Sequence, residues 1–429
     1  MNVTRLYRVS LIAVALAVCA VHPAPGAEVT FGPRHEMYVD GKLFLPVHAW
    51  AGAMKDLDRL KGHGVNVVLG LGDCSMSWKP ISDETLKTTQ RFLDELHRRD
   101  MYGAIIISAW WSKPANRGIL KDKPLSAYIN RFKDHPALLA WQVSSEDDMG
   151  LGRKARKEQG IEGWAPRPNA TAKDVIARCK EVKAIDPDHP VVVMFSGGQI
   201  LAADRKFTWT VPTPKQFYVE VSKHADIVYH DLFPVANNTA DDLRQIADAT
   251  DLLRDYSLGK HLWVAVDAGD RKRWSTKSHA PTGKEIRNEL WQALNNRAHG
   301  VGFDYTSWKP TWASIRMSED GEKGLTAAVK EIESLKGPIL RGTWPVGTRV
   351  ARQGEGMLCV KVRRFEGASY VFAVNIKPEA VQATITVRKL GNRTAKVIGE
   401  DRSVPVENDK IRDAFEGYAV HLYEIELKK

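Results

Sequence analysis

Residues 135–148 read HPALLAWQVSSEDD, and this stretch decides the fold. The proline after His135 marks the end of a preceding helix, because proline disfavours helical backbone at the residue before it. Residues 138–143 form a mainly apolar run, too short for a helix and bounded like a fully buried strand of a parallel sheet. Glu146, Asp147 and Asp148 follow directly. Carboxylates are not buried without compensation, so we expect them at the carboxyl end of the strand, where α/β folds bind ligands.

The same alternation of strand and helix extends to both sides of this stretch. Strands are expected to begin near residues 43, 65, 102, 138, 190, 226, 261 and 300. Helical segments are expected at residues 56–63, 83–99, 125–133, 171–184, 214–223, 240–256, 282–299 and 321–335. Eight such alternations predict an α/β protein with a (β/α)8 TIM barrel. The step between the fourth and fifth strands is longer than its neighbours, which predicts an insertion at residues 150–169.

The pattern changes to short alternating strands beyond residue 335. These strands are expected at residues 357–363, 369–375, 382–387 and 418–425, with Gly, Pro and Asn at the turns between them. The sequence therefore predicts a small antiparallel β-sandwich domain after the barrel. The expected domains are a signal peptide at residues 1–27, a catalytic barrel at 28–338 and the β-domain at 339–429.

The first residues are typical of a secretory signal peptide. Arg5 and Arg8 precede an apolar run at residues 11–20, and small residues and prolines follow as far as Ala27. We therefore expect an exported protein, periplasmic or extracellular. Cys19 is similar to a bacterial lipoprotein attachment site, although a valine precedes it where a smaller residue is usual.

The composition restricts the classes of function. Hydrophobic residues make up 43% of the 429 residues, enough for a large core, and the formal net charge of +10 favours anionic partners. Nucleic acid is not an expected partner, because there is no recognisable binding module or sustained basic helix. No later apolar run is long enough to span a membrane. Cys74, Cys179 and Cys359 are too widely spaced for a disulfide framework or a metal cluster, and no cofactor or metal is expected.

The active site of such a barrel forms at the carboxyl ends of its strands, so position along the chain selects the candidates. The polar and aromatic residues expected there are His48, Trp50, Asp73, Trp110, Trp111, Glu146, His230, Asp231, Asp267, Asp270, Asp304 and Trp308.

Four segments resemble the retaining glycoside hydrolases built on (β/α)8 barrels, the β-galactosidase/cellulase-like superfamily. HPALLAWQVSSEDD resembles the fourth barrel strand of these enzymes. Their sixth, seventh and eighth strands are resembled, in that order, by ADIVYHDLFPV (225–235), KHLWVAVDAGD (260–270) and AHGVGFDYTSW (298–308). The resemblance covers nearly the whole mature chain, because many members carry a β-domain after the barrel. It implies that Glu146 is the acid/base, that Asp267 takes the nucleophile's place and that Trp308 is the aromatic floor under the sugar.

The sequence departs from the superfamily at two of these positions. Ser145 stands where Asn is usual, which weakens a hydrogen bond to the 2-hydroxyl of the sugar. Asp267 stands where Glu is usual, and its shorter side chain favours water-mediated inversion or no hydrolysis at all. The resemblance implies a secreted glycoside hydrolase that cleaves a β-linked glycan with paired carboxylates. The alternative is a barrel protein that binds glycan without cleaving it.

The chemistry needs one protonated and one ionised carboxyl group on opposite sides of the glycosidic bond. Like-charge repulsion from Asp147 and Asp148 is expected to raise the pKa of Glu146. The alternative for Glu146 is that it is a surface carboxylate at the start of the insertion loop, without a catalytic role. The alternative for Asp267 is that it caps the next segment or forms an ion pair with Arg271 or Arg273. Other candidates for the second carboxylate are Asp231, Asp270 and Asp304.

Substrate contacts are expected from the residues around this pair. Trp50, Trp110 and Trp111 follow strand ends, where an aromatic face stacks on a sugar ring. Ser145, Asp231, Asp304 and His230 either contact substrate or orient neighbouring groups. Two basic clusters, at residues 153–157 and 271–273, suggest an anionic glycan carrying uronate or sulfate, with ordinary solvated loop charge as the alternative.

Overall fold

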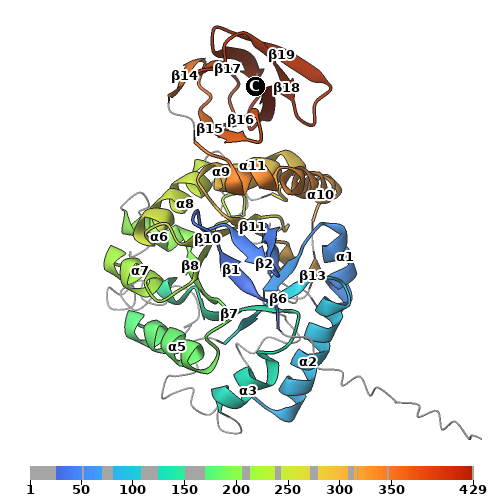
Figure 1. Cartoon of the computed structure of the whole chain (residues 1–429), viewed down its shortest axis with the longest axis vertical. Coiled ribbons are helices and arrows are strands. Elements are labelled where there is room, and N and C mark those ends of the chain that lie inside the picture. Colours follow the sequence, from blue (N-terminus) through green and yellow to red (C-terminus); the bar gives the residue numbers. More distant parts are fainter. Residues whose placement is uncertain are drawn as a thin grey trace, which may run out of the picture.

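The structure is a computed structural model that describes residues 26–50, 53–69, 81–107, 124–149, 170–204, 213–236, 243–270, 279–307, 314–315, 317–344 and 347–427. Its centre is a closed barrel of parallel strands, and the predicted (β/α)8 barrel is confirmed (Figure 1). In order around the barrel the strands are β4 (Val47–Trp50), β5 (Val67–Leu69), β6 (Tyr102–Ile106), β7 (Leu138–Ser145), β8 (Val191–Ser196), β9 (Ile227–Asp231), β10 (His261–Asp267) and β11 (Gly300–Asp304).

Helices surround the barrel (Figure 1), and all of the described ones except the single turn η1 contribute buried apolar residues to the core between helices and strands. They are η1 (Met54–Asp56), α1 (Leu57–Gly62), α2 (Asp83–His97), α3 (Leu125–Phe132), α5 (Ala172–Ile185), α6 (Gly197–Ala203), α7 (Lys215–Ser222), α8 (Arg244–Tyr256), α9 (Gly283–Asn295), α10 (Glu319–Ser334) and α11 (Lys336–Arg341). Side-chain caps fix several of their starts. Thr282 Oγ1 accepts from the Glu285 amide at 3.2 Å, and the Glu285 carboxylate accepts from the Thr282 amide at 2.8 Å.

The first barrel strand differs from the expectation. Residues 43–47 do not form one strand, because β3 (Lys42–Phe44) pairs with β2 (Met37–Val39) and the barrel strand β4 begins only at Val47. Pro46 lies between the two strands, and a proline has no amide hydrogen to give to a sheet ladder. His48 is therefore inside the barrel strand, not after it.

A small antiparallel sheet closes the amino-terminal end of the barrel. It consists of β1 (Val29–Phe31), β2 and β3, which lie across the barrel in Figure 1. Met37 and Val39 of β2 are buried in one cluster with interior residues of the barrel such as Val67 and Trp263. The opposite end of the barrel, where the strands finish, is left for the candidate site.

The C-terminal domain is one antiparallel sheet, and the predicted β-domain is confirmed. Its strands are β14 (Thr348–Gln353), β15 (Leu358–Phe365), β16 (Ala368–Asn375), β17 (Val381–Val387), β18 (Arg393–Val397), β19 (Arg402–Glu407), β20 (Lys410–Phe415) and β21 (Val420–Glu426). The sequence predicted only β15, β16, β17 and β21. The expected boundary between residues 338 and 339 falls inside α11.

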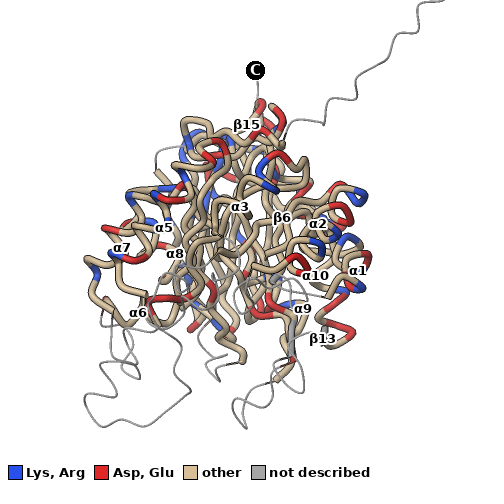
Figure 2. Tube along the Cα trace, turned by 90° about the horizontal axis from the view of Figure 1, so that it is seen from below, with Lys and Arg blue, Asp and Glu red and all other residues tan. Residues whose placement is uncertain are grey.

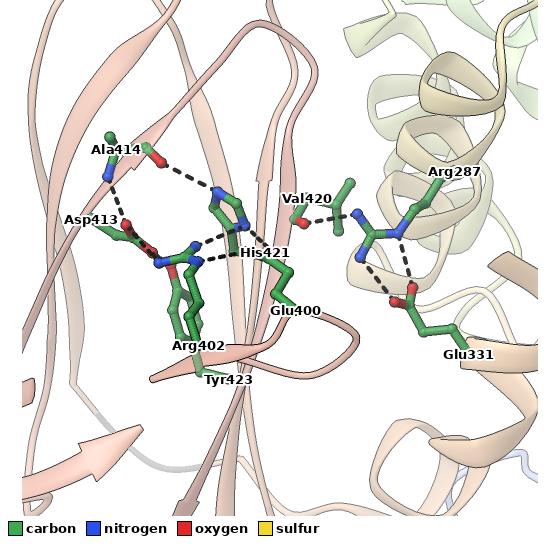
Figure 3. Close-up of polar contacts among 9 residues, drawn as sticks. All are labelled: Arg287, Glu331, Glu400, Arg402, Asp413, Ala414, Val420, His421 and Tyr423. Atoms are coloured by element: carbon green, nitrogen blue, oxygen red, sulfur yellow. Dashed lines mark hydrogen bonds and ion pairs between the residues drawn. The ribbon is translucent and has the colours of Figure 1, made fainter. Parts of the chain in front are cut away.

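Polar contacts join this domain to α9 of the barrel (Figure 3). Arg287 donates to the Val420 carbonyl at 2.8 Å and forms an ion pair with Glu331 of α10 at 2.9 Å. Within the domain, Arg402 pairs with Glu400 at 2.6 Å and with Asp413 at 2.9 Å. A cavity of about 620 Å³ lies between these two groups of residues. It is an interdomain space, separate from the carboxyl ends of the barrel strands.

Charged residues lie mainly on the outside of the barrel. Lysines, arginines and carboxylates alternate along α1, α2, α5 and α7, whereas β6 in the centre of the view carries no charge (Figure 2). Of the helices in the described part of the chain, none combines the length and apolarity that a membrane span requires.

Candidate active site

Strand β7 carries the candidate acid to the open end of the barrel. All of its residues before Ser145 are buried, and Ala140 packs in the interior cluster of the barrel. The register with β8 shifts between Gln142 and Ser144, and the Ser144 hydroxyl donates to the Met194 carbonyl at 3.1 Å. Such a bulge turns the end of a strand locally, as is frequent beside functional sites.

Glu146 occupies the single position between β7 and a helical turn. Residues 147–149 are already helical, and the Met149 amide donates to the Glu146 carbonyl at 3.0 Å. The backbone of Glu146 has a φ of 53°, in the left-handed region. This conformation costs a residue with a side chain about 1–3 kcal/mol and is concentrated at functional sites. Glu146 is partly exposed, so the turn places an accessible carboxyl group at the carboxyl end of the strand.

Asp148 anchors this turn through hydrogen bonds to the neighbouring strand and helix. It is fully buried, and both of its carboxylate oxygens accept from the Ser196 amide at 3.1 Å. Its Oδ2 also accepts from the Tyr218 hydroxyl at 3.1 Å. Burial raises the pKa of Asp148 well above its usual range, and the nearby Glu146 and Asp147 add to the rise. Asp148 is therefore a weaker source of negative charge for Glu146 than the sequence suggested, and its contacts give it a positioning role.

Asp267 ends β10 on the interior side of the barrel. Trp263 and Ala265 belong to the interior cluster, and the alternation of a strand places Asp267 on the same side. Asp267 is 0% exposed, and its Oδ2 accepts from the Ala236 amide at 2.7 Å. This bond ties the end of β10 to the segment that follows β9. Arg271 and Arg273, its alternative partners, lie outside the described residues.

Glu289 lies directly behind Asp267 and was missed by the sequence analysis. It belongs to α9, is fully buried, and its Oε2 accepts from the Asp267 amide at 3.2 Å. Burial raises the pKa of Glu289 well above its usual range, and the charge of Asp267 adds to the rise. The signal in the sequence was a glutamate on the apolar face of the expected helix at residues 282–299.

Two further carboxylates share the interior side with Asp267. Asp304 is the register partner of Asp267 on β11, and Asp231 on β9 is the register partner of Ala265. Asp231 and Asp304 are 8% and 6% exposed. Three neighbouring strands thus end in carboxylates, while Asp270 lies three residues past β10 and is half-buried.

His230 faces the other way, into the layer between the barrel and α8. Its Nε2 lies 3.1 Å from Thr250 Oγ1, and burial lowers its pKa to about 3. Neighbouring residues of a strand point to opposite sides, so His230 points outward while Asp231 points into the barrel. This position does not support the expected contact between His230 and substrate. His230 instead fixes α8 against β9.

His48 lies deeper in the barrel interior than the expected mouth position. Its ring stacks on Trp263 with centroids 5.2 Å apart and meets the edge of Tyr229 at 5.0 Å. Burial lowers the pKa of His48 to about 3, so the ring is neutral. Its neighbour on β11 is Gly302, where an added Cβ would lie 2.1 Å from His48 Nδ1. His48 therefore forms part of the floor below the candidate site.

Several expected site residues lie outside the described residues. They are Asp73, Trp110, Trp111, Trp308 and the basic clusters at residues 153–157 and 271–273. Trp50 is the last residue of β4, and Ser145 is the half-buried last residue of β7. In the described part of the chain, no group of three or more His, Cys, Asp or Glu side chains is arranged to hold a metal ion.

Comparisons of sequence gave no matching protein family and no matching curated relative. Comparisons of structure gave many similar proteins. A β-galactosidase from the psychrophilic Marinomonas ef1 has a TM-score of 0.57 at 10% identity, over 90% of this chain and 100% of that one. A glycoside hydrolase family 5 protein from Bacteroides vulgatus has a TM-score of 0.55 at 11% identity, over 93% and 94%. An α-amylase from Geobacillus thermoleovorans has a TM-score of 0.51 at 13% identity, over 90% and 99%.

The chain has the fold of (β/α)8 glycoside hydrolases. The match extends through both the barrel and the β-domain, since it covers at least nine tenths of this chain in all three cases. At these identities the likeness concerns the fold, and chemistry must be argued from the site itself.

Proposed function

We propose that the chain is a glycoside hydrolase in which Glu146 is the general acid/base and Asp267 is the nucleophile or general base. The observation that carries the proposal is the backbone of Glu146, with a φ of 53° at the carboxyl end of β7. The other described non-glycine residues with positive φ lie in turns before barrel strands, in the amino-terminal hairpin or in the C-terminal domain. A costly conformation at the expected catalytic position supports a functional constraint there.

The reaction follows from the two roles. Glu146 gives its proton to the glycosidic oxygen as the bond from that oxygen to the anomeric carbon breaks. The Asp267 carboxylate then bonds to the anomeric carbon, and water later displaces it while Glu146 takes back a proton. In the inverting form, Asp267 takes the proton of a water molecule that attacks the anomeric carbon directly. Carboxyl groups about 5–5.5 Å apart fit the first course, and about 6.5–9.5 Å fit the second.

The substrate proposed is a β-linked glycan, with uronate or sulfate groups as a refinement, and the protein is proposed to act after export. The net charge of +10 supports an anionic substrate, and the signal-like first residues support export. The structurally similar proteins include both α-amylases and β-galactosidases, so the β-linkage rests on the sequence resemblance.

A second candidate function is glycan binding without hydrolysis. The position of Asp267 favours it, because the carboxylate is 0% exposed and accepts from the Ala236 amide at 2.7 Å. A carboxylate that only holds two loops together would make this same contact.

Turnover of a panel of nitrophenyl α- and β-glycosides and of neutral and acidic polysaccharides tests the proposal. We expect release of product by the wild-type protein and its loss in Glu146→Gln on the polysaccharides, whose leaving groups need a proton, with glycan binding retained in both. Glu220→Gln is a matched control, because Glu220 lies on the outer helix α7. A wild-type protein that binds glycan but releases no product from any member of the panel supports the binding protein instead.

A further inference from the structure

The seam between the barrel and the C-terminal domain contains a tryptophan with cations packed against it. Thr343 forms an antiparallel bridge with Arg364 of β15, with both amide-to-carbonyl distances at 2.8 Å. This register places Trp344 opposite Arg363 and diagonal to Lys361 on the same face of the sheet. The guanidinium carbon of Arg363 lies 3.9 Å from the ring centroid of Trp344, and Lys361 Nζ lies 4.8 Å from it.

The barrel adds a third cation to this cluster. Arg297 lies in the turn between α9 and β11, and its guanidinium carbon is 4.0 Å from the Trp344 centroid. Arg297 is exposed and Trp344 is 43% exposed, whereas Arg363 is buried. We call Arg297, Trp344, Lys361 and Arg363 the seam cluster. One edge of it faces solvent.

None of the three cations of the seam cluster forms an ion pair with a carboxylate among the described residues. The nearby Asp251 is engaged with Arg254 at 3.0 Å. At another contact between the barrel and the C-terminal domain, Arg287 is paired with Glu331. Positive charge is therefore concentrated at the seam and is offset only in part by the charges of Asp251 and Asp255.

Burial and the mutual repulsion of these cations lower the pKa of two members of the cluster. Burial lowers the pKa of Lys361 to about 8, and the neighbouring Arg363 and Arg297 contribute to the shift. Burial also lowers the pKa of Arg363 to about 10, again with a contribution from Arg297. The electron-rich face of Trp344 offsets part of this repulsion. An anion at the open edge would offset much more of it, because both guanidinium and ammonium groups bind oxyanions.

We infer that the seam cluster binds the sulfate or carboxylate groups of an acidic glycan. Arg297 and Lys361 supply the donors, and the ring of Trp344 packs against both of them. The binding of an oxyanion stands on the cluster alone, whereas the choice of a glycan as its carrier rests on the proposed function. Arg297 precedes β11, so the cluster lies toward the amino-terminal end of the barrel, away from Glu146. The seam cluster would hold part of a glycan that lies outside the site of cleavage.

Calorimetric titration of the full chain with a κ-carrageenan hexasaccharide, its desulfated form, an oligogalacturonate and sodium sulfate tests the inference. All titrations use the Glu146→Gln background, which prevents cleavage and separates binding here from hydrolysis. We expect binding of the sulfated or the uronate oligosaccharide, and binding about tenfold weaker in Arg297→Gln/Lys361→Gln. The control Lys389→Gln/Lys410→Gln removes two exposed charges from the same domain and is expected to change affinity less than about twofold.

Three results would overturn the inference. Equal affinity in the double variant and its control would show that the glycan binds elsewhere on the protein. Equal affinity for the desulfated hexasaccharide would remove the role of the oxyanion. Binding of sodium sulfate through Arg297 and Lys361, without binding of either acidic glycan, would assign the cluster to a small free anion.

The pH dependence gives an independent readout of the same cluster. Anion binding favours protonated Lys361, so affinity should be constant up to about pH 8 and should fall above it as the free protein loses this proton. The charged and titratable groups that face Lys361 are Arg363 and Cys359 on its own strand, Arg297 before β11 and Asp251 on α8. Affinity that stays constant from pH 6 to pH 9.5 would contradict binding through Lys361.

Discussion

Glu146 at the end of β7 is partly exposed on left-handed backbone, whereas Asp267 at the end of β10 is fully buried and accepts a hydrogen bond from Ala236. The backbone at Glu146 is strained, whereas the hydrogen bond of Asp267 stabilises the end of β10. This difference fits the two roles proposed, because the acid/base must exchange protons with solvent while the nucleophile must be held in one place. It also means that stability and activity should respond differently at the two positions.

The largest effect is expected from Asp267→Asn. If Asp267 attacks the anomeric carbon or activates water, its loss should reduce kcat by about 10⁴-fold or more on every substrate. The amide oxygen of Asn still accepts from Ala236, so the fold should be retained. Steady-state rates together with a thermal melt check both points. A variant that folds and keeps more than about a tenth of the wild-type rate would assign the second carboxylate to Asp231, Asp270 or Asp304.

Removal of the buried carboxylate altogether should also destabilise the protein. In Asp267→Ala the Ala236 amide loses its acceptor in a buried place, which costs about 1–3 kcal/mol. Chemical denaturation of the wild type, Asp267→Asn and Asp267→Ala measures this cost. Equal unfolding free energies for all three would mean that the contact with Ala236 does not hold the end of β10.

Glu146→Gly should have the opposite effect on stability. Glycine adopts a φ of 53° without the steric cost of a side chain, so the variant should be inactive yet more stable by about 1 kcal/mol. Glu146→Ala is the matched control, because it removes the carboxylate but keeps the strain. If the glycine variant is no more stable than the alanine variant, the backbone at this turn is not strained.

A smaller effect is expected behind Asp267, from Glu289→Gln. The pKa of Glu289 is raised in the folded protein above the value of 4.5 that applies when it is unfolded. Its contribution to stability is therefore complete below about pH 4.5 and is lost as pH rises through the folded pKa. Gln does not titrate, so the variant should gain about 1 kcal/mol relative to the wild type near pH 7 and nothing at pH 4. Denaturation curves at both pH values check this, and a difference independent of pH would contradict a buried, proton-binding Glu289.

Much of the barrel was predictable because each strand is short, apolar and followed by an amphipathic segment. The expected starts at 102, 138, 261 and 300 coincide with β6, β7, β10 and β11. The first strand was misplaced because the apolar run of residues 43–47 serves two sheets, separated by Pro46. Helix α6 was missed because its Gly197-Gly198 start is typical of a loop. Gly197 is needed there because an added Cβ would lie 2.6 Å from the Asp231 carbonyl.

The sequence predicted which residues lie at the ends of strands, but it did not predict their backbone conformation or their hydrogen-bond partners. Glu146 and Asp267 were placed at strand ends from the sequence, and the strands do end there. The left-handed backbone of Glu146 depends on how β7 turns into the next helix, and no residue type in SSEDD specifies it. The hydrogen-bond partners of the two buried aspartates come from helices 70 and 22 residues away in sequence: the Tyr218 hydroxyl donates to the Asp148 carboxylate, and the Asp267 amide donates to Glu289. Such contacts follow from tertiary packing and carry no local signal.

The most direct test of the paired roles is the dependence of the Glu146→Gln rate on the leaving group. A dinitrophenyl glycoside needs no proton to leave, whereas a methyl glycoside of the same sugar does. The account predicts that kcat/KM of Glu146→Gln falls about 10²–10⁴-fold on the methyl glycoside and less than about tenfold on the dinitrophenyl glycoside, whereas kcat/KM of Asp267→Asn falls equally on both. The comparison uses kcat/KM because this constant does not include the later step in which Glu146 accepts a proton from water. Equal losses in Glu146→Gln on the two substrates would contradict the assignment of Glu146 as the acid.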